Sequence, residues 1–296
     1  MMRRDTPVAV TPRPKRHRLD LVARGAYLLL ALLGAFIMIF PVFWMLSTAL
    51  KQAGDVFTSP PILFPVHPQW KNFADAVTLP ALSDNFFRYV WNTSWYTALA
   101  VLGDTLSGAV VAYGFARLRA PGSTVLFFLV LATIMVPFEA TLVPQIVLFK
   151  TLGWIDTPLP LIVPTFFGNA FNIFLLRQFF RGIPHELDEA ATLDGLGFPG
   201  IFWRIILPLS KPALAAVAVF SFVFHWNDLL TPLVYLNTSN KYPVSLALYF
   251  FTGSYGNAQW NLLMAAALIS ALPCLLLFFA AQRYFIQGIV VSGVKG

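Results

Sequence analysis

The chain has 296 residues, of which 58% are hydrophobic and 11% are charged, and its formal net charge is +7. A soluble domain has about 25% charged and at most about 50% apolar residues, so this composition excludes an ordinary water-soluble fold. Seven Lys and Arg residues lie in the basic arm of residues 1–25, for which contact with anionic lipid is favoured over nucleic acid.

Six apolar segments follow the basic arm, and each is long enough as a helix to cross a hydrocarbon core about 30 Å thick. The first segment is longer than the core of a cleavable signal peptide, so it is expected to remain as a membrane helix. Prolines blur the ends of the third and fourth segments, but membrane helices tolerate proline. The sequence therefore predicts an all-α integral membrane fold, a single domain over residues 26–296. The expected spans cover residues 26–48, 91–116, 123–142, 159–176, 212–231 and 262–282.

The distribution of Lys and Arg predicts the orientation, because basic residues are retained in the cytoplasm. With the N-terminus inside, the inner segments hold 15 of the 20 basic residues and the outer segments hold 5. Both termini are therefore expected in the cytoplasm. The outer loop of residues 49–90 is rich in Pro, Trp and Phe, so part of it is expected to lie along the outer membrane surface. Docking of an external partner is a second interpretation of this loop, compatible with the first.

The sequence lacks the motifs of several catalytic and cofactor sites. No phosphate-binding G-x-x-x-x-G-K-[ST] loop and no G-x-S-x-G nucleophile elbow occurs. The four histidines are scattered, and the single cysteine, Cys274, lies inside an apolar segment, so neither a metal site nor an internal disulfide is expected. The sequence thus predicts a chain that is not an enzyme and binds no cofactor itself.

Three ionisable residues fall within or at the edges of the spans. Glu139 follows a proline near the outer end of the third span, and it is interpreted as lining a solute path or meeting a partner. Asp104 is expected to have a buried structural role, favoured over solute contact. Trp226, Asn227 and Asp228 suit stacking and hydrogen bonding to a sugar, but a tryptophan here also suits an aromatic belt.

The loop of residues 177–211, between the fourth and fifth spans, is predicted to form a helix–turn–helix on the cytoplasmic face. Pro184 suits the start of a first helix, which is expected to run to about Asp194 and stop at Gly195. A second short helix is expected from Pro199 through Ile206, with Pro208 preventing its continuation.

A fixed spacing of residue types runs through this loop and matches E-A-A-x3-G-x9-I-x-L-P in full. This pattern resembles the signature loop of permease subunits of bacterial ABC importers. Shorter stretches at residues 113–119, 174–180, 226–228 and 282–296 are similar to the maltose-type carbohydrate branch of that family, in the family's order. The matching residues, with Asp194 between them, are Glu189, Ala190, Ala191, Asp194, Gly195, Ile205, Leu207 and Pro208.

The resemblance implies that the loop is a coupling helix seated in a cleft of a separate ATPase, which carries the ATP and Mg²⁺. It further implies a second permease subunit, two ATPase copies, an extracytoplasmic solute-binding protein and a place in the cytoplasmic membrane of a prokaryote. The solute would be a sugar or sugar-like molecule, with disaccharides, oligosaccharides, glycerophosphates and other polyols all compatible. The long basic arm is not explained by the resemblance.

Two other classes of protein remain as alternatives to an ABC-importer permease. A secondary transporter of a small polar solute would need no ATPase and would more typically show inverted repeats with an intramembrane ion site. A membrane enzyme is disfavoured by the few ionisable residues within the spans. Co-purification with an ATPase would separate the three.

Overall fold

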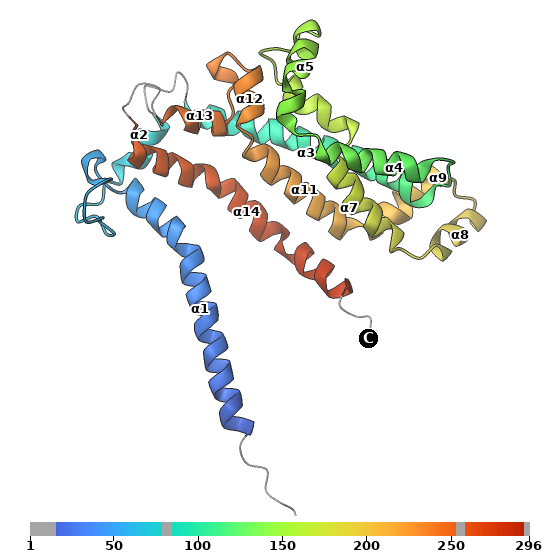
Figure 1. The fold of residues 1–296 in the computed structure, drawn as a ribbon, viewed down its shortest axis with the longest axis horizontal. Coiled ribbons are helices and arrows are strands. Elements are labelled where there is room, and N and C mark those ends of the chain that lie inside the picture. Colours follow the sequence, from blue (N-terminus) through green and yellow to red (C-terminus); the bar gives the residue numbers. More distant parts are fainter. Residues whose placement is uncertain (1–15, 79–84, 253–257, 293–296) are drawn as a thin grey trace, which may run out of the picture.

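The computed structural model describes residues 16–78, 85–252 and 258–292, and its side chains within residues 24–78, 85–252 and 258–282. Residues 1–15 of the basic arm and residues 293–296 of the C-terminal motif lie outside this part. Within the described ranges every regular element is a helix (Figure 1). The all-α prediction is confirmed for that part of the chain.

Four helical segments of the described chain are long and apolar enough to cross a membrane. Two lie within the long helices α1 (Arg16–Ala49) and α14 (Trp260–Ser292), and a third is α3 (Phe86–Arg117). The fourth runs over Leu159–Arg181 and combines α6 (Leu159–Ile162), η3 (Val163–Phe167) and α7 (Ala170–Arg181). Two bent helix pairs raise the number to six if each pair is one span.

The third predicted span, residues 123–142, is not one straight helix. Helix α4 (Ser123–Ala132) and η2 (Thr133–Met135) are followed by α5 (Phe138–Thr151), which is turned by 96°. Pro137 causes the break, because it has no N–H to donate and it holds Val136 in an extended conformation with ψ 114°. Glu139 therefore lies in the first turn of a new helix rather than at the end of a span.

The fifth predicted span, residues 212–231, also ends early. Helix α11 (Lys211–Trp226) stops at Trp226, and a separate helix, α12 (Leu230–Tyr235), follows. The Asn227 side chain donates to the Val223 carbonyl, while Asp228 accepts from the Thr231 N–H at the start of α12. Short polar side chains compete in this way for backbone groups, and the helix is interrupted between them.

The remaining elements are short and connect the long helices. On one side of the molecule lie η1 (Ala53–Asp55), α2 (Lys71–Val77), η5 (Ser239–Lys241) and α13 (Val244–Phe250). The loop between α7 and α11 contains α8 (Glu186–Leu193), α9 (Phe198–Ile201), η4 (Phe202–Ile206) and α10 (Leu207–Leu209). In Figure 1 these two groups lie at opposite ends of α3.

Two clusters of buried side chains hold the bundle together, and α3 contributes to both. The first cluster joins the start of α3 to α2, α13, α14 and the end of α11. The second joins the end of α3 to α7, α8, α9 and the start of α11, and is called here the loop-end core. Helix α1 extends away from the bundle, and its buried residues within the described part, Ser47, Thr48 and Ala49, lie at its C-terminal end.

Candidate coupling loop and membrane cavity

The first helix of the signature loop ends as its sequence predicts. Gly195 has φ +83°, a conformation that L side chains adopt only with strain. Its N–H donates to the Thr192 carbonyl at 3.0 Å, and the Leu196 N–H donates to the Ala191 carbonyl at 2.9 Å. These two bonds form a Schellman motif, which satisfies carbonyls left free at the end of α8. The turn between the two helices is therefore fixed by backbone geometry at Gly195.

The second helix of the loop does not stop before Pro208, contrary to the prediction. Residues Phe202–Ile206 form a π-helical turn, in which the Leu207 N–H donates to the Phe202 carbonyl. This wider turn makes room for the proline ring, so the chain continues helically to Leu209. The helix ends at Ser210, and α11 then leaves at an angle of 78°.

The signature residues fall into a buried and an exposed group. Ala191 is buried in the loop-end core, and Ile205 and Leu207 pack against that core. The others are exposed on the outside of the loop: Glu189, Ala190, Asp194, Gly195 and Pro208. The first group anchors the loop to the bundle, and the second group is accessible to another protein. Contact of these residues with an ATPase remains a prediction.

Arg117, counted above among the basic inner residues and part of the family-like stretch of residues 113–119, is buried at the centre of this region. Its Nη2 donates to the carbonyls of Phe180, at 2.6 Å, and Ile183, at 2.7 Å. Its Nη1 donates to Asp188 Oδ2 at 3.2 Å and to His185 Nδ1 at 3.1 Å. One side chain thus joins the end of α3 to the end of α7 and to α8. The signals in the sequence were an arginine at the end of an apolar helix and the family-like stretch of residues 113–119 that contains it.

A cavity of about 510 Å³ lies between α3, α5, η3, α11 and α12. Its described polar side chains are Asp104, Gln145, Thr165, Asn169, His225, Asp228 and Thr231. Asp104 and His225 face each other, with 2.9 Å between Oδ2 and Nε2, and their side chains are only 7% and 14% exposed. Such a lining offers several hydrogen-bond donors and acceptors in an otherwise apolar bundle.

His225 is a residue that the sequence analysis missed. It was considered only as a metal ligand, and no group of three or more potential ligands occurs in the described part of the chain. The available signal was Asp104, because a carboxylate within a membrane span needs a partner inside the bundle. Asp104 itself is buried and hydrogen-bonded, as its favoured structural role requires.

The small residues near Asp104 allow close packing. A side chain at Gly103 would collide with Thr165, and Ser107 donates to the Thr165 carbonyl at 2.9 Å. Helix α3 and η3 therefore touch at this point, beside the cavity.

The four predicted solute-path residues occupy different environments. Asp228 lines the cavity. Trp226 is 4% exposed, and its Nε1 donates to the Ser270 carbonyl within the core. Asn227 is exposed and bonded to its own helix, and Glu139 is exposed beside Phe138, which lines the cavity. The structure brings only Asp228 of the four into the described lining. Solute contact by any of them remains a prediction.

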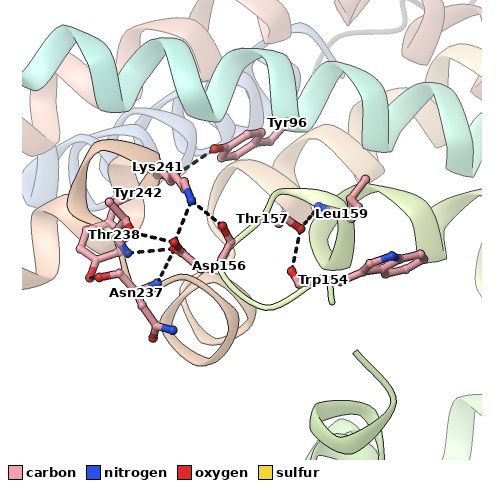
Figure 2. Close-up of polar contacts among 9 residues, drawn as sticks. All are labelled: Tyr96, Trp154, Asp156, Thr157, Leu159, Asn237, Thr238, Lys241 and Tyr242. Carbon is pink, nitrogen blue, oxygen red and sulfur yellow. Dashed lines mark hydrogen bonds and ion pairs between the residues drawn. The ribbon is translucent and has the colours of Figure 1, made fainter. Parts of the chain in front are cut away.

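Figure 2 shows a polar clamp between two loops at the opposite end of α3 from the signature loop. Asp156 Oδ1 accepts from the N–H groups of Asn237, at 3.0 Å, and Thr238, at 2.9 Å. Its Oδ2 accepts from Thr238 Oγ1 at 2.6 Å and Lys241 Nζ at 2.7 Å. Tyr96 of α3 donates to the Lys241 carbonyl at 2.9 Å. The clamp therefore ties the α5–α6 loop and the α12–α13 loop to α3.

The Asp156 carboxyl is strongly acidic in this clamp. Partial burial by itself raises its pKa, but the hydrogen bonds from Lys241, Thr238 and the Asn237 N–H lower the pKa by a larger amount. The pKa of Asp156 consequently lies well below its usual value. The carboxylate stays ionised throughout the physiological pH range.

Three features define a multi-pass membrane transport subunit. The chain has apolar helices of spanning length, a polar cavity lies among these helices, and an exposed helix–turn–helix connects two of them. The sequence matches the family described as binding-protein-dependent transport system inner membrane component over residues 105–291. The osmoprotective compounds uptake permease protein GgtD of Synechocystis sp. is 35% identical, over 88% of this chain and 89% of the relative. The arabinooligosaccharides transport system permease protein AraQ of Halalkalibacterium halodurans is 31% identical, over 88% and 93%.

A solved structure also resembles this fold. The crystal structure of a bacterial ABC transporter involved in import of the acidic polysaccharide alginate contains a chain with a TM-score of 0.74 and 24% identity. The match covers 93% of this chain and 100% of that one. The chain therefore belongs to the family of binding-protein-dependent transport system inner membrane components. It is a permease subunit that works with a solute-binding protein, and it is not an enzyme.

Proposed function

We propose that this chain forms half of the translocation pathway of an ATP-driven importer for a sugar or sugar-like solute. In this proposal α8 is the coupling helix, which receives motion from a separate ATPase. The observation that carries it is the signature loop, whose buried residues anchor α8 while Glu189 and Ala190 remain exposed for a partner. ATP and Mg²⁺ are bound by the ATPase in this proposal and not by this chain.

The proposed assembly contains a second permease subunit, two ATPase copies and an extracytoplasmic solute-binding protein. Six spans are proposed: the four long segments, the bent pair of α4 and α5 counted as one, and α11. Both termini and the loop of residues 177–211 are proposed to lie in the cytoplasm. The support is the basic-residue asymmetry of 15 to 5 and the position of the loop and the Asp156 clamp at opposite ends of α3.

The lining of the cavity supports a neutral polyhydroxylated solute. Asp104 is already paired with His225, whereas Asp228 presents a second carboxylate to the cavity. The phosphate of a glycerophosphate would be repelled by this carboxylate, and the described lining residues include no Lys or Arg to offset the repulsion. Neutral sugars and polyols would find donors and acceptors in Gln145 and Asn169. The name of the relative AraQ, which specifies arabinooligosaccharides, agrees with this class, whereas the structural neighbour takes part in the import of an acidic polysaccharide.

The test has two stages. The tagged chain is purified from its native membrane, and the co-purifying proteins are identified. The complex is then placed in liposomes with its solute-binding protein, and ATP hydrolysis is measured with a panel of oligosaccharides, polyols and a glycerophosphate. A neutral solute should stimulate hydrolysis and enter the liposomes. Uptake by the purified chain without any ATPase would instead establish a secondary transporter.

A further inference from the structure

Arg117 is the end of a rigid path between the signature loop and the cavity. Helix α3 is continuous over its 32 residues from Phe86 to Arg117. Asp104, which pairs with His225 at the cavity, lies on the same helix about 20 Å away at 1.5 Å per residue. A displacement imposed on Arg117 therefore moves one wall of the cavity.

The contact between Arg117 and α8 is directional. The Arg117 side chain is 1% exposed and that of Asp188 is 19% exposed, with 3.2 Å between Nη1 and Oδ2. Charge-assisted hydrogen bonds of this kind are about twice as strong as neutral ones and fix the relative orientation of their partners. By contrast, Ala191 joins α8 to the loop-end core through apolar packing alone, which has no preferred direction.

The second half of the loop is held by the same end of α3. The Tyr113 hydroxyl donates to the Phe198 carbonyl at 3.1 Å, and the Tyr113 ring lies 5.0 Å from the ring of Phe202. The outer side of α8 is free, since Leu193 is 89% exposed. Both halves of the loop are thus attached to one helix, and Arg117 is the attachment for α8.

We propose that Arg117 is a positioning residue that transmits the motion of α8 to α3 through Asp188, and so couples the loop to the solute cavity. This inference rests on the proposed function of α8 as the coupling helix. The carbonyls of Phe180 and Ile183 orient the guanidinium toward Asp188, so that a displacement of α8 is passed to α3 through this contact. Lysine cannot make the same contacts, because it lacks the planar guanidinium that bonds the two carbonyls and Asp188 at the same time.

The first test measures coupling in the reconstituted complex. Arg117→Lys, Asp188→Asn and the double variant are compared with the parent for solute transported per ATP hydrolysed. Each single variant should lose about tenfold, the loss typical of one hydrogen bond between charged groups. The double variant should be no worse than the single ones, because both remove the same link. Assembly and basal hydrolysis should persist. Arg119→Lys, at an exposed position nearby, is the matched control and should transport as the parent does.

The second test measures positioning directly. Spin labels are attached at Val110 on α3 and Leu193 on α8, both exposed, after Cys274 is replaced by Ser. In the parent complex the distance between the labels should be narrowly distributed and unchanged by nucleotide. Asp188→Asn should broaden it. Full coupling in the variants, or an equally narrow distance in Asp188→Asn, would overturn the role of Arg117. A parent complex in which ATP drives no uptake would instead overturn the proposed function.

Discussion

The Asp104–His225 pair places a carboxylate and an imidazole 2.9 Å apart between α3 and α11. Both side chains are largely buried, so the hydrogen bond satisfies two groups that would otherwise be desolvated without a partner. The pair therefore stabilises the wall of the cavity, in addition to any contact that it makes with solute.

Replacement of His225 by Ala should destabilise the protein, because it leaves the Asp104 carboxylate buried and alone. The expected loss is about 1–3 kcal/mol in the free energy of unfolding. Thermal unfolding in detergent can be followed with a thiol-reactive dye, since Cys274 is the single cysteine and is half-buried in α14. His67→Ala, at an exposed position, is the control and should unfold as the parent does. Equal stability of the two variants would mean that the Asp104–His225 pair contributes nothing to the free energy of unfolding.

The Asp156 clamp gives a pH-dependent prediction. Because the pKa of Asp156 is lower in the folded protein than the usual value of about 3.9, the clamp stabilises the folded state above that pH. This stabilisation is lost as the pH falls through the lowered pKa. Asp156→Asn should cost about 1–3 kcal/mol at neutral pH. The difference in unfolding temperature between parent and variant should be constant from pH 8 to about 5 and shrink below about 4. A difference that is independent of pH in acid would show that the charge of Asp156 is not involved.

At the scale of the element, the turn after α8 depends on one backbone conformation. Gly195 has φ +83°, and a Cβ built there meets no atom within 4 Å. Any penalty at this position is therefore one of backbone strain and not of crowding.

Gly195→Val should leave the protein assembled but uncoupled. The left-handed conformation costs a β-branched residue about 1–2 kcal/mol, which favours continuation of α8 and re-aims Glu189. Solute-stimulated ATP hydrolysis should be lost while basal hydrolysis persists, measured on complexes quantified by pull-down. Gly197→Ala is a matched control, because Gly197 has φ −79° and room for a methyl group. A Gly195→Val complex that couples like the parent would show that coupling does not depend on the turn at Gly195.

The sequence predicted those helix ends that are determined by a few consecutive residues. The stop of α8 could be foreseen from Gly195, because a Schellman turn depends on a few consecutive residues. The 96° break at Pro137 could not, because proline is compatible with both a spanning and a broken helix, and neighbouring helices decide between them. Pro208 was misjudged for a related reason, since a π-helical turn absorbs its ring.

The partners of the buried charged residues could not be predicted from local sequence patterns. Asp104 and His225 are 121 residues apart in the sequence, and Arg117 and Asp188 are 71 residues apart. Neither spacing belongs to a motif, so the sequence could indicate that each charge needed a partner but not which one. The signature loop was found because its residue types and spacing lie within a single segment.

At the scale of the whole molecule, the orientation in the membrane is open to a direct test. Single cysteines are placed at His67, in the outer loop, and at Gly197, in the signature loop, after Cys274 is replaced by Ser. Both positions are exposed. An impermeant thiol reagent should label His67→Cys in intact cells, and Gly197→Cys only after the membrane is opened. The reverse pattern would invert the orientation and remove the signature loop from the side where ATP is available.

The separation of α1 from the bundle has a consequence for how the chain is made. The contact between the end of α1 and the start of α14 joins Lys51 and Asn261, which are 210 residues apart in sequence. At a synthesis rate of about 5–20 residues per second, α1 leaves the ribosome roughly 10–40 s before its neighbour exists. During that interval the newborn helix must be stable in lipid alone. Its composition suits this, because residues 26–46 contain no charged side chain and its buried polar residues, Ser47 and Thr48, lie in the last turn.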